Sequence, residues 1–204
     1  MRSKQLTTHA CLCQALVLAA GQGKRFGSDK RQAHLPGGQT VLSATLALAL
    51  EHFDVVTLVL RPDDDHQAMN IDPRVRVIRA RQANVGLSAS LAAGIAALQD
   101  SSAQAAAVLL GDMPWIAQAT LRSLCAKAHA ERIVMPVYQG QRGHPVIFGR
   151  AFWAALEQVK GDEGGRQVIQ ANAPACIRVE VDDPGVLLDI DTPADLSAGI
   201  SFPG

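Results

Sequence analysis

Residues 15–30, ALVLAAGQGKRFGSDK, begin as an apolar run and end as a short basic loop that contains three glycines. A plain surface turn needs one glycine and no cations, whereas a loop that presses its backbone N–H groups against an anion needs glycines and nearby positive charge. Lys24, Arg25 and Lys30 supply that charge. The stretch therefore predicts a buried strand that leads into an anion-binding loop, with a basic surface turn as the alternative.

The composition favours one α/β domain. The chain has 204 residues, of which 48% are hydrophobic and only 4% aromatic, as expected for helices that pack closely on a sheet. Nineteen Lys and Arg residues balance 19 Asp and Glu residues, so the surface has no broad field for nucleic acid or an anionic membrane. The 4 cysteines follow neither a zinc spacing nor a disulfide framework, and no apolar run is long enough to span a bilayer. We expect a cytoplasmic protein without nucleic-acid or membrane partners.

The N-terminal segment is expected to be a flexible leader over residues 1–13, followed by one domain over residues 14–204. Arg2 and Lys4 precede an apolar stretch that resembles a short signal peptide. However, Gln14 interrupts that stretch, and cleavage after Ala20 would separate the glycine loop from the strand that presents it. We therefore do not interpret the segment as a signal peptide.

Short apolar runs alternate with helical patterns along the chain. The predicted strands are Ala15–Ala20, Val55–Leu60, Val75–Ala80, Ala106–Leu110, Ile133–Val137, Val146–Phe148 and Ile177–Val181. The predicted helices are Val41–His52, Leu87–Leu98, Ala117–Ala130, Ala151–Val159 and Gly165–Ala171. This alternation predicts a mostly parallel, Rossmann-like sheet with helices on both faces. Such a sheet binds ligands beyond the carboxyl ends of its strands, and polar segments follow several of these strands, so we expect one site built from several loops.

The glycine loop matches neither of two familiar phosphate-binding motifs. A Walker A loop requires Gly-Lys-Ser/Thr after four intervening residues, and this string does not occur. The dinucleotide fingerprint requires a third glycine three positions after Gly23, at position 26, but Gly27 comes one position late. The loop therefore predicts phosphate contacts through its own amides together with Arg25 and Lys30.

Two further segments place carboxylates where a metal could bind. Asp112 ends an apolar strand in LLGDMPW, and a carboxylate there can either bind Mg²⁺ or start a turn. In DIDTPADL, Asp189 and Asp191 can bind the same ion, although Asp191 or Thr192 can instead cap a helix that begins at Pro193.

Five segments together resemble the molybdenum cofactor (molybdopterin) cytidylyltransferases, within the nucleotidyltransferases that resemble molybdopterin-guanine dinucleotide synthesis proteins. These segments are LAAGQGKRFG…DK, LLGDMP, RGHPVIF, GDEGGR and DIDTPADL, in order from about Leu18 to Leu196. The first two are common to the wider superfamily, and the other three narrow the resemblance to the molybdenum cofactor branch.

The resemblance implies a nucleotide site made of Leu18, Ala19, Ala20, Gly21, Gly23, Arg25, Lys30, Asn84, Gly86, Ser88 and Ser90. Within this set, Arg25 would contact the β- and γ-phosphates and Lys30 the α-phosphate, while the segment from Asn84 to Ser90 would face the base. No Asp or Glu lies between Pro73 and Gln99 to accept the two N–H groups of a guanine, which favours CTP over GTP.

The resemblance also assigns the metal and the acceptor. Asp112 and Asp191 would hold Mg²⁺, with Asp189 as the alternative to Asp191, and Lys30, Arg25 and Asp112 would be catalytic. Arg142 or His144 would lie near the phosphate of molybdopterin, although a histidine before a proline is otherwise a packed loop residue. The polar segment KRQAHLP departs from the aliphatic residues common in the family, so the access route to this site is expected to differ.

The implied reaction transfers CMP from CTP to molybdopterin or its molybdenum form and releases pyrophosphate. The attacking phosphate is already anionic, so alignment and charge neutralisation replace a general base. A recipient molybdoenzyme would be a further partner. The alternatives are a nucleotidyltransferase of the same fold that uses GTP or a sugar phosphate, a non-catalytic molybdoenzyme maturation factor, and a nicotinamide oxidoreductase, which the displaced third glycine disfavours.

Overall fold

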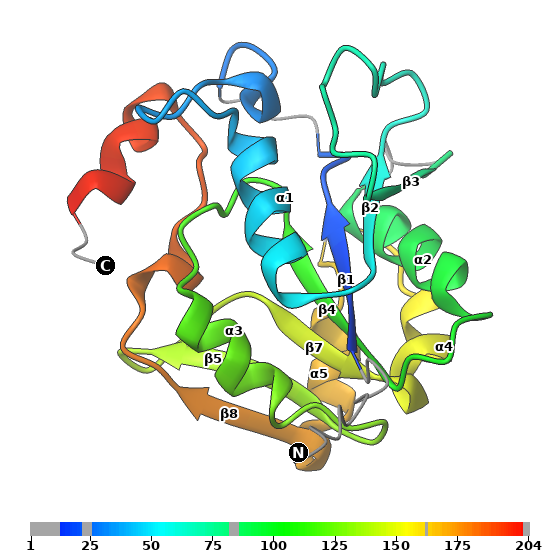
Figure 1. The fold of residues 1–204 in the computed structure, drawn as a ribbon. Helices are drawn as coiled ribbons and strands as arrows, with labels where there is room; N and C mark the ends of the chain where they lie inside the picture. The colour runs from blue at the N-terminus through cyan, green and yellow to red at the C-terminus, as the bar shows by residue number, and fades with distance from the viewer. Residues whose placement is uncertain (1–12, 22–25, 82–85, 162, 202–204) are drawn as a thin grey trace, which may run out of the picture.

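The computed structural model describes residues 13–21, 26–81, 86–161 and 163–201, which form one mixed sheet between two layers of helices (Figure 1). The strands are β1 Cys13–Leu18, β2 Val56–Leu60, β3 Arg76–Arg79, β4 Ala105–Leu110, β5 Ile133–Tyr138, β6 Gln141–Arg142, β7 Val146–Gly149 and β8 Cys176–Glu180. The α-helices are α1 Val41–His52, α2 Leu87–Leu98, α3 Gln118–Cys125, α4 Trp153–Glu157 and α5 Arg166–Ala171. The 3₁₀ helices include η1 Lys30–Gln32, η3 Arg150–Phe152, η4 Ala173–Ala175, η5 Pro184–Leu187 and η6 Pro193–Ser201.

The eight-stranded sheet has the order β3-β2-β1-β4-β7-β5-β6, with β8 paired to β5. Strands β1 to β4 are parallel to one another, and β5 and β8 run in the same direction. Strands β6 and β7 run the opposite way, because they return antiparallel to β5. The mostly parallel sheet predicted from the sequence is confirmed, and the reversal of β7 brings the segment before it to the edge at which the parallel strands end.

Alternate residues of β1 divide the buried side chains between two faces of the sheet. Leu16 and Leu18 pack with α2, α4 and α5, whereas Ala15 and Val17 pack with α1 and α3. Figure 1 shows α1 and α3 on the side of the sheet that faces the viewer. The expectation of helices on both faces is therefore confirmed, and both faces of β1 are buried as its non-alternating apolar sequence indicated.

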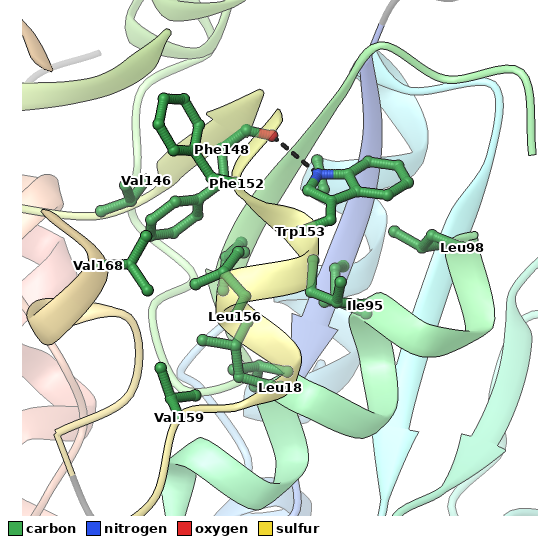
Figure 2. Packing of buried hydrophobic residues seen from close by; sticks show 14 of the residues in the cluster. Leu18, Ile95, Leu98, Val146, Phe148, Phe152, Trp153, Leu156, Val159 and Val168 are labelled. Atoms are coloured by element: carbon green, nitrogen blue, oxygen red, sulfur yellow. Dashed lines mark hydrogen bonds between the residues drawn. The ribbon is translucent and has the colours of Figure 1, made fainter. Parts of the chain in front are cut away.

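Trp153 is the largest fully buried side chain and joins α4 to the sheet. Figure 2 shows its indole between α2 and β7, with Ile95 and Leu98 beside it. The indole Nε1 donates a 3.1 Å hydrogen bond to the Phe148 carbonyl oxygen, so its polar atom is satisfied inside the core. This packing anchors α4 and β7 below the edge that carries the polar loops.

The main differences from the predicted elements lie at their ends. β1 stops at Leu18 instead of Ala20. α3 stops at Cys125 instead of Ala130, because the Ala130 carbonyl accepts a hydrogen bond from Ala151 N at 2.9 Å and the chain must turn to reach it. β6 was not predicted, since two residues carry too little pattern.

The N-terminal leader was predicted for residues 1–13, of which residues 1–12 lie outside the described residues. Cys13 is the first residue of β1 and is buried. The domain boundary therefore stays a prediction. None of the helices in the described part of the chain is long and apolar enough to cross a membrane.

Candidate active site

Lys30 joins two carboxylates that are far apart in the sequence. Its Nζ lies 2.7 Å from Asp112 Oδ2 and 2.9 Å from Asp191 Oδ1. Oxygen atoms of Asp112, Asp189 and Asp191 all lie within 4.8 Å of one another. The structure therefore brings the predicted lysine and the three predicted carboxylates into one cluster.

The local folding explains why these groups meet. Lys30 is the first residue of η1 and Asp112 follows β4, so both lie where the neighbouring strands β1 and β4 end. Ile190 is fully buried against Phe26 and Val41, and its N–H donates a 3.0 Å hydrogen bond to the Asp112 carbonyl oxygen. Because this residue is fixed, the aspartates on either side of it are held at the ends of β1 and β4.

The charges in the cluster influence one another. Burial opposes the charge of Lys30, but hydrogen bonds and ion pairs with Asp112 and Asp191 raise its pKa overall, so the ammonium is fully protonated at neutral pH. Burial raises the pKa of the Asp189 carboxyl, and the negative charges of Asp191 and Asp112 raise it further. Three carboxylates and one ammonium leave the cluster with excess negative charge that a cation can neutralise.

A cavity of about 370 Å³ lies at the ends of β1 and β4, and His144 in its wall is close enough to Asp112 and Asp189 for their charges to oppose the lowering of its pKa by burial. Its walls are mostly apolar, and Leu87, Leu91 and Phe148 belong to them. The polar side chains on it are those of Arg142, His144, Glu163 and Arg166. The size and lining are typical of a site that encloses an organic ligand and orients it through a few charged groups.

His144 contributes a buried polar atom to this cavity. The backbone N–H of His144 donates a 2.8 Å hydrogen bond to the Val186 carbonyl oxygen, which fixes the backbone of the RGHP segment. Among the described residues its ring Nδ1 has no hydrogen-bond partner. Burial lowers the pKa of the imidazole, and the nearby Asp112 and Asp189 carboxylates only partly oppose this effect. A neutral imidazole with an unpaired nitrogen can accept or donate one hydrogen bond to a ligand.

The predicted nucleotide-binding residues differ in how the structure presents them. Ala19 and Ala20 have buried side chains, so any contact with a ligand must use their backbone, whereas Leu18 borders the cavity. Ser88 and Ser90 are only 1% and 3% exposed, and neither belongs to the cavity wall. The residues Gly23, Arg25 and Asn84 lie outside the described part of the chain. Contacts between this group and a nucleotide remain predictions.

Two sets of residues at the site were missed by the sequence interpretation. Glu163 and Arg166 stand in the quoted motif GDEGGR but received no role, although both border the cavity. Arg61 and Asp64 follow β2 at the same edge of the sheet; Arg61 donates to the Ala20 carbonyl oxygen of the glycine loop, and Asp64 accepts from Arg31, which follows the loop. The second set could have been predicted, because the polar segment RPDDD directly follows a predicted parallel strand, and ligands bind beyond the carboxyl ends of such strands.

The family of the protein follows from its sequence match. The MobA-like NTP transferase domain matches residues 15–176. The chain belongs to this family. Its fold and the family together make it a nucleotidyltransferase of the MobA-like type, and the recognition made from the five motifs is confirmed at that level.

Similar proteins include relatives with different described roles. The chain is 27% identical over 189 residues to the purine catabolism protein PucB of Bacillus subtilis, covering 88% of this chain and 92% of the relative. It is 25% identical over 183 residues to the molybdenum cofactor cytidylyltransferase of Escherichia coli, covering 88% and 91%. The crystal structure of Rv0371C in complex with manganese, from Mycobacterium tuberculosis, is similar with a TM-score of 0.75 and 26% identity over 94% of this chain and 100% of that chain.

Proposed function

We propose that this MobA-like NTP transferase domain transfers CMP from CTP to molybdopterin or its molybdenum form and releases pyrophosphate. The observation that carries the proposal is the position of Lys30, which Asp112 and Asp191 hold at the ends of β1 and β4 beside the cavity. In phosphoryl transfer, a lysine can stabilise the negative charge that develops on the phosphate, and carboxylates can hold the metal ion that neutralises it. The similarity to the molybdenum cofactor cytidylyltransferase of Escherichia coli supports the choice of substrates.

The acidic cluster fits a divalent cation. Mg²⁺ binds oxygen ligands at about 2.1 Å, so ligands on opposite sides of the ion are about 4 Å apart. The three carboxylates, whose oxygens lie within 4.8 Å of one another, need only small shifts to reach this spacing. Asp112 and Asp191 would hold the ion, and Asp189 is the further candidate ligand. When bound, the cation would neutralise charge on the triphosphate and the departing pyrophosphate. The mycobacterial relative was crystallised in complex with manganese, which supports the use of a divalent ion.

The cavity supports an acceptor with a flat ring system and an anionic group. Apolar side chains such as Leu87 and Phe148 suit the faces of a heteroaromatic ring, while Arg142 and Arg166 suit a phosphate. The unpaired Nδ1 of His144 offers one directed hydrogen bond. A terminal phosphate held here would lie beside Lys30, whose raised pKa keeps it positively charged during the transfer. The arrangement therefore requires alignment of two anionic substrates and no nucleophilic side chain.

The test measures pyrophosphate release with purified molybdopterin as the acceptor and CTP or GTP as the donor, each with Mg²⁺ or Mn²⁺. We expect kcat/KM for CTP to exceed that for GTP by at least about 10-fold, or about 1.4 kcal/mol. Pyrophosphate release with GTP but not with CTP would instead identify a nucleotidyltransferase of different specificity. Release only when a sugar phosphate is the acceptor would lead to the same conclusion. Binding of molybdopterin without release from any nucleotide would identify a non-catalytic maturation factor.

A further inference from the structure

The Arg31 guanidinium, next to Lys30 in the chain, uses all five of its N–H donors inside the protein. Nε and Nη2 donate to the Asp29 carboxylate at 2.8 and 2.6 Å. Nη1 and Nη2 donate to the Asp64 carboxylate at 2.5 and 2.7 Å, and Nη1 also donates to the Ala19 carbonyl oxygen at 2.8 Å. The Arg31 side chain is only 5% exposed. A buried guanidinium with every donor satisfied is a rigid anchor and cannot itself bind a ligand.

Arg61 extends this anchor along the same loop. Its Nε donates to the Ala20 carbonyl oxygen at 3.2 Å, and its Nη2 donates to the Gly21 carbonyl oxygen. The backbone N–H of Arg61 in turn donates to Asp64 Oδ2 at 2.8 Å. Two arginines thus hold the carbonyl oxygens of three consecutive residues, immediately after β1 ends.

This arrangement determines where the amides of the loop point. In a trans peptide the C=O group of one residue and the N–H group of the next point in opposite directions. Because the Ala19 and Ala20 carbonyls face the arginines, the N–H groups of Ala20 and Gly21 must face away from them. The same contact explains why β1 ends early, because the Ala19 carbonyl oxygen pairs with Arg31 instead of with a neighbouring strand. It also explains why a charged residue stands at position 31 in the polar segment KRQAHLP.

The same side chain also fixes the turn that carries Lys30. Asp29 caps η1 by accepting a 3.2 Å hydrogen bond from the Arg31 N–H. Successive side chains in a 3₁₀ helix lie about 120° apart, so Arg31 holds the turn from one side while Lys30 reaches the acidic cluster from another. The hydrogen bonds from Arg31 also lower the pKa of Asp29. At Asp64 burial is the largest effect and raises the pKa, but the hydrogen bonds and charges of Arg31 and Arg61 together lower it overall.

We propose that Arg31 is a positioning residue for nucleoside triphosphate binding. Together with Asp29, Asp64 and Arg61 it forms a clamp that turns the loop amides towards the nucleotide, while Asp112 and Asp191 hold the ammonium group of Lys30. The inference rests on the proposed function, because it assumes that a nucleotide binds at this loop. Since the clamp shapes the ground-state binding surface, its loss raises the Kd and the KM for the nucleotide more than it lowers kcat.

The experiment titrates CTP and Mg²⁺ into the full chain by calorimetry and measures kcat and KM with molybdopterin. Arg31→Lys keeps the charge but loses the planar fork, and we expect its Kd for CTP to rise by at least about 10-fold while kcat changes by less than about 3-fold. Asp64→Asn should change the Kd in the same direction. Arg74→Met is the control at the surface, because Arg74 and Asp72 also form an Arg–Asp contact two residues apart, but the Arg74 side chain is 68% exposed.

Arg31→Lys and Asp64→Asn are compared at a temperature at which circular dichroism shows that each is folded, so a loss of stability alone cannot produce the result. A folded Arg31→Lys protein with the parent's Kd and KM would overturn the inference, as would an equal rise in Kd for Arg74→Met. If the parent protein binds no nucleoside triphosphate with Mg²⁺ or Mn²⁺ present, the proposed function fails and the inference fails with it.

Discussion

Replacement of Asp112 by asparagine tests the proposed catalytic role of this residue against a structural one. Asp112→Asn keeps the size and turn chemistry of the side chain and removes its charge. We expect turnover to fall by at least about 100-fold, because the proposed ligand of the divalent cation, which is also a partner of Lys30, is lost. In contrast, we expect the free energy of unfolding in the absence of metal to stay within about 1 kcal/mol of the parent value.

The small effect on stability follows from opposing electrostatic interactions within the cluster. With an effective dielectric constant of about 20, an ion pair at the 2.7 Å between Asp112 and Lys30 is attractive by about 6 kcal/mol. Two carboxylates at the 4.8 Å that bounds the cluster together repel Asp112 by about 7 kcal/mol under the same assumption. Solvent reduces both values in the same way, so the charge of Asp112 contributes little to folding.

Lys30→Met is the contrasting variant, because it removes two attractive contacts and leaves three carboxylates together. We expect it to lower the free energy of unfolding by about 1–3 kcal/mol. Urea denaturation with a chelator present measures both stabilities, and pyrophosphate release measures turnover. A loss of more than about 3 kcal/mol in Asp112→Asn, with full activity in the fraction that remains folded, would refute the reasoning and make Asp112 a turn-forming residue.

Three further predictions concern stability. Burial and like charge raise the pKa of Asp189 above its ordinary value of 3.8, so this carboxyl lowers the stability of the fold as pH rises through and beyond that value. Without metal, Asp189→Asn should therefore be more stable than the parent at neutral pH. In thermal denaturation, the melting temperatures of the two proteins should converge near pH 3. A Cβ on Gly143 would lie 2.4 Å from the Val186 carbonyl oxygen, so urea denaturation should show that Gly143→Ala costs about 1–3 kcal/mol while Gly37→Ala, in open space, is neutral. Trp153→Phe should cost about 1–3 kcal/mol in the same assay, because it removes a buried hydrogen bond and volume, and a cost below about 0.5 kcal/mol would contradict the packing in Figure 2.

The sequence predicted the parts of the fold that depend on local pattern. The helices Val41–His52 and Leu87–Leu98 have the predicted bounds, since each carries an apolar stripe and begins after a residue suited to a helix start. The end of β1 could not be predicted, because it depends on contacts with Arg31 and Arg61, which no local pattern reveals. The side-chain direction of Arg31 depends on Asp64, which lies on another loop.

The sequence predicted those residues of the candidate site that lie in segments after predicted strands or in a recognisable motif. Asp112 was found because it follows a predicted strand, Lys30 because it is a cation of the glycine loop after the first predicted strand, and Asp191 because it stands in a recognisable motif. The direct contact of Lys30 with both carboxylates was not foreseen, since the sequence interpretation assigned the lysine to a phosphate. The burial of Ser88 was also not foreseen, because it depends on which face of α2 meets the sheet.

The hydrogen bond between Lys30 and Asp191 joins residues that are 161 positions apart in the chain. During synthesis on a ribosome, β1 to β4 can pair before the segment after β8 has left the exit tunnel, so this part of the sheet can form before the candidate site is complete. Closing so long a loop depends on the correct placement of nearly every intervening element. We therefore expect catalysis to recover late in refolding. Activity should report the docking of the segment after β8 more sensitively than the circular dichroism signal of the helices does.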